Sequence, residues 1–301
     1  MRITQRTLTQ NSLTGINRNM VAISKLQDQL TSGKTITKPS DSPTGTNSSL
    51  QLRGALAASN QYQRNMTDGK SWLSTTDTAL ESMTQQVQRV RDLTVQAMNT
   101  GSMSGTDQQA IAAEVSQLQT SLLGLANTQV GGRPIFGGTT SDTSAYAADG
   151  TYTGRGGTAA DPATPNTRRI SAAATVRVDV TGAEAFGDQS QGDDLFAVVG
   201  KIADLATSDP SQLGDQLSAL DTAISRMSNA LSDVGARMNR ITNAQSTNTD
   251  LNLSLTSQLS GVEDTDMAKS IMNLQLQQTS YQAALSVSAS ALQQTLVDFL
   301  R

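Results

Sequence analysis

Two short stretches of the chain carry the residue types that end a phosphate-binding loop. Gly33-Lys34-Thr35 and Gly69-Lys70-Ser71 each place a lysine and a hydroxyl after a glycine, as in loops that hold nucleotide phosphates. That motif also needs a second glycine five positions earlier and a strand that leads into it. Asp28 and Arg64 stand at those positions, and helical patterns precede both stretches. The sequence therefore predicts a nucleotide site at neither stretch.

An acidic stretch from Asp188 to Asp194 offers oxygen ligands of the kind that bind calcium. It lacks the final bidentate glutamate of a calcium loop and the order of ligands along such a loop. Aspartate is also a preferred residue at the N-terminus of a helix, where its carboxylate accepts backbone N–H groups. We therefore predict a turn and a helix cap here, and no metal site.

The chain of 301 residues has no histidine and no cysteine. Their absence removes the commonest general base, the commonest metal ligand, thiolate chemistry and disulfides. Catalysis by lysine or carboxylate groups stays open as an alternative, although no nucleophile has a histidine partner. We predict that the protein is not an enzyme and has no catalytic residue, no cofactor-binding residue and no metal.

The composition favours extended helices with narrow apolar seams. Hydrophobic residues make up 36% and aromatic residues 3% of the chain, which is low for a compact enzyme. The net charge of −4 and the lack of a basic patch argue against nucleic acid as a partner. The sequence contains no run of about twenty apolar residues, so we predict no membrane span. The first residues carry no secretory signal, so the protein stays inside the cell or leaves by a route that reads no such signal.

Apolar residues at alternating steps of four and three residues predict a long helix at each end of the chain. Each helix has one apolar face, so the two are expected to pack on each other or on further copies. The plainer alternative is an ordinary bundle whose ends meet. The candidate assembly residues are Leu13, Ile16, Met20, Ile23, Leu30, Ile271, Leu274, Tyr281, Leu285, Leu292, Leu296, Phe299 and Leu300.

The chain between the terminal helices predicts further helices and one inserted region. The clearest stripes run from Leu73 to Ala97, from Ile111 to Leu125 and from Leu213 to Val262, and Asp264 or Thr265 is expected to cap the last helix. A turn follows the first helix, because glycine and proline recur there. Its structural residues are Gly33, Pro39, Asp41, Pro43 and Gly45.

The inserted region is rich in glycine, threonine, aspartate and proline, and it contains short alternating runs. In the best run, from Ala174 to Val180, three valines face one way while Arg177 and Asp179 face the other. A long disordered loop is the alternative interpretation. We expect residues 141–190, which lack heptad positions, to project outward from a tube of assembled copies and to tolerate deletion.

The predicted fold is mainly α: a long antiparallel helical bundle or coiled coil formed by the N- and C-terminal regions, with a small inserted β-rich domain. We expect an N-terminal helix over residues 1–40, two rod segments over 41–130 and 194–262, the insert over 131–193, and a C-terminal helix over 263–301.

Several motifs resemble those of the bacterial flagellin superfamily, over essentially the whole chain. The segment Gln29-Leu30-Thr31-Ser32-Gly33-Lys34-Thr35-Ile36 and the turn with two prolines resemble the first turn of that superfamily, and of the hook-associated protein 3 family in particular. Pro134–Thr139 and Val176–Gly182 are similar to the β region of that family, and Gln277–Leu285 and Thr295–Leu300 to its end. Val297 departs conservatively from the leucine that is usual there.

The resemblance implies an extracellular structural subunit at the junction between hook and filament. It implies a ring of copies around the flagellar axis, with hook-associated protein 1 on one side and flagellin on the other. It also implies export through the flagellar type III apparatus, without a cleaved signal peptide and with a dedicated export chaperone. The alternatives are a flagellin, which forms the filament itself, and an intracellular coiled-coil scaffold or signalling rod.

Overall fold

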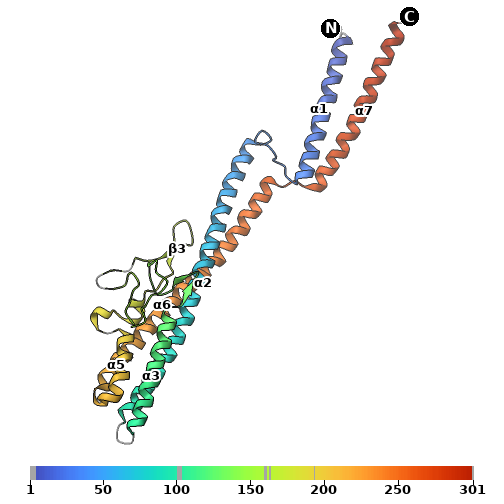
Figure 1. Cartoon of the computed structure of the whole chain (residues 1–301). Coiled ribbons are helices and arrows are strands. Elements are labelled where there is room, and N and C mark those ends of the chain that lie inside the picture. The colour runs from blue at the N-terminus through green and yellow to red at the C-terminus, as the bar shows by residue number, and fades with distance from the viewer. Residues whose placement is uncertain (1–4, 100–103, 159–160, 163, 193, 300–301) are drawn as a thin grey trace. The chain divides into compact units, whose positions relative to one another are not determined.

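The computed structural model describes residues 5–99, 104–158, 161–162, 164–192 and 194–299, and only the backbone of residues 5, 6, 8, 191 and 291–299 (Figure 1). The chain divides into two compact units. We call residues 1–58 and 251–301 the terminal unit, and residues 59–250 the central unit. The helices α2 (Pro43–Met98) and α6 (Leu213–Glu263) contribute to both. In the described part of the chain no helix is both long and apolar enough to cross a membrane.

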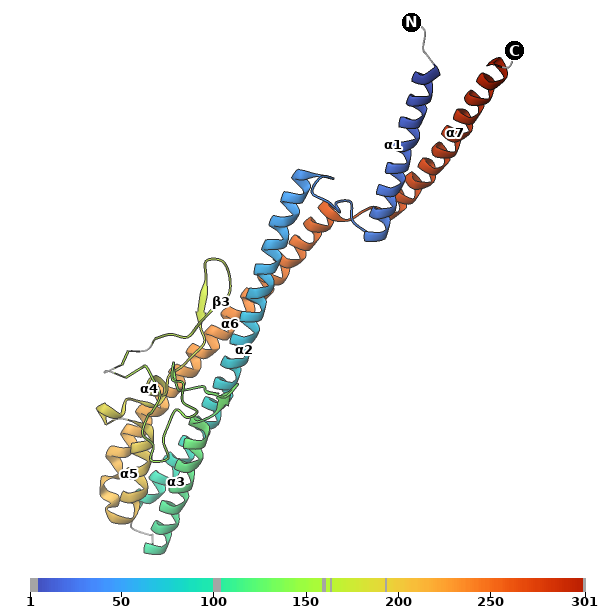
Figure 2. The ribbon, with the colours of Figure 1, turned by 45° about the horizontal axis from the view of Figure 1, so that its top comes forward.

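In the central unit, α2 and α6 lie antiparallel, as both ribbon views show (Figure 2). Ser59 bonds to Asn248 at 3.0 Å, and further along the pair Arg91 bonds to Asp221 at 2.6 Å. The helices α3 (Gly105–Ala126) and α5 (Leu195–Ser208) pack on each other. A capping box of Ser104 and Asp107 starts α3. A short 3₁₀ helix, η3 (Pro210–Gln212), leads from α5 into α6.

The heptad stripes predicted from the sequence form the core of the central unit. All eight stripe residues of α2 are buried, namely Leu73, Thr76, Leu80, Met83, Val87, Val90, Thr94 and Ala97. On α6, fully buried residues recur at every seventh position, namely Leu213, Leu220, Met227, Val234 and Ile241, and Ala223 is fully buried beside them. The other half of the α6 stripe, including Ile224 and Leu231, is half-buried. The antiparallel helical fold is thereby confirmed.

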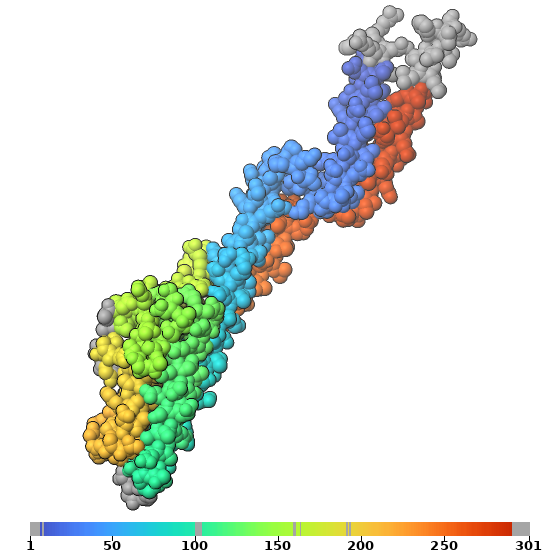
Figure 3. All heavy atoms as spheres, viewed as in Figure 1, coloured from blue at the N-terminus to red at the C-terminus, as the bar shows by residue number. Residues whose placement is uncertain are grey.

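The insert is built from two small hairpins and a short helix. β1 (Gln129–Val130) pairs antiparallel with β2 (Arg133–Pro134) through Gly131 and Gly132, whose φ angles of 59° and 79° suit a two-residue hairpin turn. β3 (Thr167–Arg169) pairs antiparallel with β4 (Thr175–Arg177). A capping box of Thr181 and Glu184 begins α4 (Gly182–Phe186). The insert covers one side of the helices of the central unit (Figure 3).

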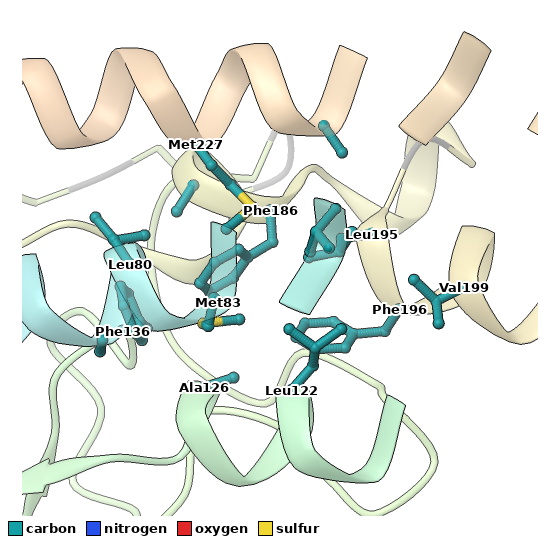
Figure 4. Packing of buried hydrophobic residues seen from close by; sticks show 14 of the residues in the cluster. Leu80, Met83, Leu122, Ala126, Phe136, Phe186, Leu195, Phe196, Val199 and Met227 are labelled. Atoms are coloured by element: carbon teal, nitrogen blue, oxygen red, sulfur yellow. The ribbon is translucent and has the colours of Figure 1, made fainter. Parts of the chain in front are cut away.

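Aromatic side chains fasten the insert to the helical core. Phe136 and Phe186 meet edge to face with ring centroids 4.9 Å apart, and Tyr146 lies 4.6 Å from Phe196 of α5. These rings are fully or almost fully buried among residues of α2, α3 and α6 (Figure 4). Tyr146 and Phe186 therefore belong to the core of the central unit, and the outward projection of residues 141–190 from an assembled tube stays a prediction.

The alternating run in the insert behaves as predicted for its valines but not for its aspartate. Val176, Val178 and Val180 are buried. Asp179 is fully buried as well, because Arg177 pairs with its carboxylate at 2.9 Å and the backbone N–H of Asn166 donates to it. Such burial of a charge is tolerated only when the charge is paired and hydrogen-bonded.

The acidic stretches act as helix caps. Asp188 caps the 3₁₀ helix η2 (Gln189–Gln191) and Asp194 caps α5, which confirms the predicted turn and helix cap. For the last helix, α7 (Met267–Phe299), the predicted cap is wrong. Asp266 rather than Asp264 or Thr265 receives the N–H of Lys269, because α6 continues through Gly261 to Glu263.

Candidate assembly site of the terminal unit

The two terminal helices pair with each other. α1 (Gln5–Ser32) packs against α7, and the pairing is antiparallel because Gly33 meets Thr265 while Asn19 meets Gln277. Of the predicted assembly residues, Ile16, Ile23, Leu30, Leu274 and Tyr281 are half-buried in this unit. The side chains of Leu292, Leu296 and Phe299 lie outside the described residues, as does Leu300.

The other predicted assembly residues lie outside this helix pair. Leu13, Met20, Ile271 and Leu285 are between 42% and 56% exposed. The less exposed positions are those one residue earlier, namely Ser12, Asn19, Ser270 and Ala284. The side chain of Asn19 shares a 3.0 Å hydrogen bond with Gln277. The inner seam therefore includes polar residues, and several large apolar side chains remain exposed.

The terminal unit as a whole has an inverted distribution of apolar side chains. Among the described residues, every fully buried apolar side chain belongs to the central unit, whereas Ser49, Glu263 and Ser270 are the buried residues of the terminal unit. Exposed apolar side chains gathered on one unit in this number indicate a site of interaction. The terminal unit carries twelve of the fourteen exposed large apolar side chains: Leu13, Met20, Val21, Leu50, Leu251, Leu253, Met267, Ile271, Met272, Leu276, Leu285 and Val287.

A buried carboxylate holds the terminal unit together where its four helical segments meet. Glu263, at the end of α6, is 3% exposed and accepts hydrogen bonds from Lys34 and Arg53, both at 2.7 Å, and from the hydroxyl of Ser49. We call these four residues the clasp. The hydrogen bond from Arg53, supported by Lys34 and Ser49, lowers the pKa of Glu263 to about 2, so the carboxylate is ionised at neutral pH.

Backbone hydrogen bonds reinforce the clasp. The N–H of Thr35 donates to the carbonyl of Glu263 at 2.6 Å, and the N–H of Thr265 donates to the carbonyl of Gly33 at 3.0 Å. Gly33 adopts a φ of 69°, which favours glycine and ends α1. The segment that follows α1 therefore lies in register with the segment that precedes α7.

Asp41 organises the turn between α1 and α2. Its carboxylate receives the N–H and hydroxyl of Thr37 and the N–H of Lys38, and it pairs with Lys25 at 3.1 Å. The bond with Lys25 and these donors hold the pKa of Asp41 well below its usual range. Pro43 begins α2, a position that suits its missing N–H.

Space is also limited at Gly45 in the same turn. A Cβ there would lie 2.5 Å from Ile36 and 2.8 Å from the hydroxyl of Ser42. Pro39 is exposed and lines a pocket beside the clasp. The residues predicted to form the turn thus lie together between α1 and α2, next to the clasp. The clasp itself was not predicted from the sequence.

Three clasp residues escaped the sequence analysis. Glu263 looked like part of an acidic linker, and Ser49 and Arg53 looked like ordinary polar positions on α2. Their spacing of four residues places both on one helix face, and that was the only available signal. The partner lies more than 200 residues away in the chain.

The exposed apolar side chains of this unit are suited to binding other molecules. Within the described residues, no group of three or more acidic side chains could hold a metal ion. Gly33-Lys34-Thr35 belongs to the clasp and Gly69-Lys70-Ser71 lies within α2. Paired terminal helices with exposed apolar side chains, together with a second unit that has its own apolar core, are typical of a structural protein.

Comparison with known proteins agrees with this class. The bacterial flagellin N-terminal helical region matches residues 3–141, and the C-terminal helical region matches residues 217–300. The chain belongs to the bacterial flagellin family. It is 30% identical to the flagellin of Bacillus subtilis, over 98% of this chain and 97% of that protein. It is 28% identical to flagellar hook-associated protein 3 of Escherichia coli, over 94% and 95% respectively.

Solved structures share the fold. The flagellar hook-associated protein 3 of Legionella pneumophila aligns with a TM-score of 0.60 at 15% identity, over 70% of this chain and 98% of that chain. The FlgL protein of Bacillus cereus aligns with a TM-score of 0.58 at 22% identity, over 70% and 99%.

Proposed function

We propose that this chain is a structural subunit of the bacterial flagellum that joins the hook-associated zone to the flagellin filament. The observation that carries the structural role is the terminal unit, whose fully buried residues are polar and which exposes twelve large apolar side chains. Such helices gain most of their stability from contacts with neighbours, because burial of apolar surface is the main favourable term in association.

The choice of the junction over the filament rests on two supports. The chain matches hook-associated protein 3 of Escherichia coli along nearly its whole length. The turn after α1 also carries Pro39 and Pro43, which resemble that family more than flagellin. The full-length match to a flagellin at 30% identity keeps the filament subunit as the second candidate.

The proposed partners follow from this role. Copies of the chain form a ring around the flagellar axis, with hook-associated protein 1 on one side and flagellin on the other. The candidate contact residues are the exposed ones among the predicted set: Leu13, Met20, Ile271 and Leu285. Export to the outside of the cell takes place through the flagellar type III apparatus, with an export chaperone that holds the terminal helices.

Antibody labelling of intact flagella separates the two candidates. A junction subunit gives a narrow band of label where the filament meets the hook, in a fixed small number of copies per flagellum. Label along the whole filament would show that the chain is a flagellin. Label restricted to the cell interior would remove both candidates in favour of a scaffold.

Surface variants test the assembly residues. Ile271→Ser with Leu285→Ser should leave the melting temperature of the isolated chain nearly unchanged, because both side chains are exposed, yet the cells should lose attached filaments. Val95→Ser is the matched control, because Val95 is 40% exposed but belongs to the central unit. Equal filament attachment in both variants would count against an assembly role for these two residues.

A further inference from the structure

An open pocket of ≈350 Å³ lies beside the clasp in the terminal unit. Three basic residues line it, namely Lys34, Lys38 and Arg53, and Glu263 is the one acidic residue among the described residues around it. The lining therefore has a formal charge of +2. Ile36, Pro39 and Leu50 add apolar walls, and Leu50 is 62% exposed.

Lys38 is the cation of this pocket that no carboxylate neutralises. Lys34 and Arg53 both bond to Glu263. The backbone N–H of Lys38 donates to Asp41, but its ammonium group forms no ion pair with any described residue. An apolar rim beside an unpaired cation is suited to an acidic side chain presented by another molecule.

Charge is divided unequally along this chain, in a way that favours contact between copies. The terminal unit has 9 basic and 6 acidic residues, a net charge of +3. The central unit has 13 basic and 20 acidic residues, a net charge of −7. Opposite net charges on two parts of one chain attract when copies meet in an assembly.

One place in the central unit offers two carboxylates together. Asp77 and Glu81 lie four residues apart on α2, so they share a helix face. Neither forms an ion pair with a described residue, and like charges at this spacing destabilise a helix. Glu81 is exposed and Asp77 is half-exposed. A basic partner would relieve their repulsion, and their charge of −2 matches the pocket.

We propose that the pocket formed by Lys34, Lys38, Arg53 and Leu50 of one copy binds the Asp77–Glu81 pair of a neighbouring copy. The proposal rests on the proposed function in one respect only, which is that copies of the chain assemble side by side. The contact is direct, because exposed charges farther apart than about 8 Å are largely screened at physiological salt.

Disulfide trapping tests the proximity of the two sites, and the chain has no cysteine of its own to interfere. Chains with Ser40→Cys and chains with Thr78→Cys are produced together, and the purified flagella are oxidised. Both changes keep every charge, and both positions are exposed. We expect a crosslinked dimer from this pair. The control pairs Ser40→Cys with Thr207→Cys, an exposed helical threonine on α5, and should give none.

A charge exchange tests the energetics. Lys38→Glu and Glu81→Lys should each lower the number of attached filaments per cell, by roughly tenfold, with no change in the melting temperature of the isolated chain. The chain that carries both changes should regain attachment, because the ion pair is restored in reverse. The proposal would be overturned if the double variant attached filaments as poorly as the single variants. It would also be overturned if the single variants attached filaments normally.

The two proposals fail in different ways. In the first case, the antibody label stays in a narrow band, but the disulfide does not form or forms equally in the control pair. This result rejects the pocket contact and leaves the junction role intact. Label along the filament rejects the junction role, while a specific disulfide between copies of the filament subunit still supports the pocket contact.

Discussion

Replacing Glu263 by glutamine should open the clasp and leave the central unit folded. The Glu263 side chain is 4% exposed, and its carboxylate is shared by Lys34, Arg53 and Ser49. Removing one partner of a buried ion pair costs about 3–5 kcal/mol when the remaining charge stays buried. Lys34 and Arg53 are 42% and 51% exposed, so water recovers part of their solvation. We expect a loss of about 2–3 kcal/mol from the local stability of the clasp.

Native-state hydrogen exchange at the amides of Thr35 and Thr265 measures this loss, because both amides donate across the clasp. A change of this size accelerates their exchange by roughly 30- to 150-fold. The amide of Val198, which bonds within the central unit, should be unaffected. Asp264→Asn is the matched control, since that neighbouring carboxylate is exposed and bonds to Ser260. Unchanged exchange at Thr35 and Thr265 in the Glu263→Gln variant would refute the reasoning.

The same amides should report a dependence on pH. The folded pKa of Glu263, about 2, lies below its ordinary value of 4.5, so its contribution to stability is complete above that ordinary value. It is lost as the pH falls from about 4.5 through about 2. After correction for intrinsic exchange rates, protection of Thr35 and Thr265 should fall over this range in the natural chain. In the Glu263→Gln variant it should stay low and level.

Three further outcomes are expected. Met227→Asp places an unpaired carboxylate at a fully buried position of α6, so the melting temperature of the central unit should fall with a loss of several kcal/mol. Gly182→Ala brings a Cβ within 2.5 Å of the Tyr146 hydroxyl, and chemical denaturation should show a loss of about 1–3 kcal/mol. Limited proteolysis of the isolated chain should cut residues 1–30 and 270–301 before the central unit, because those helices bury few apolar side chains; equal resistance would contradict this.

The sequence was sufficient to predict the long helices of the central unit and their buried faces. Their heptad stripes continue over many turns, and each turn repeats the apolar spacing that marks the buried face. The eight buried stripe residues of α2 show this directly. The terminal helices were harder. Both have apolar residues over a wide arc, so the spacing identifies two adjacent faces but cannot tell which one the partner helix covers. Ile16 faces α7 while Met20 does not, although the two fit the stripe equally well.

The insert and the clasp could not be predicted for different reasons. Tyr146 stands in an irregular segment and Phe186 ends the five-residue helix α4, so no sequence period reveals that they are buried. The clasp depends on Glu263 meeting Lys34, which is 229 residues away in the chain. A single sequence has no local signal for such a pairing, because nothing near either residue depends on the other.

The hydrogen bond between Asn19 and Gln277 joins residues 258 positions apart, so the terminal pair brings together two distant points of the chain. Bringing two such distant points together costs loop-closure entropy that grows with the length of free chain between them. Once Ser59 and Asn248 have met in the central unit, only two short arms remain to be joined. Pairing of the two terminal helices is thus favoured once the central unit has folded. A substitution at Met227 that unfolds the central unit is therefore expected to weaken assembly through α1 and α7, although Met227 lies on α6.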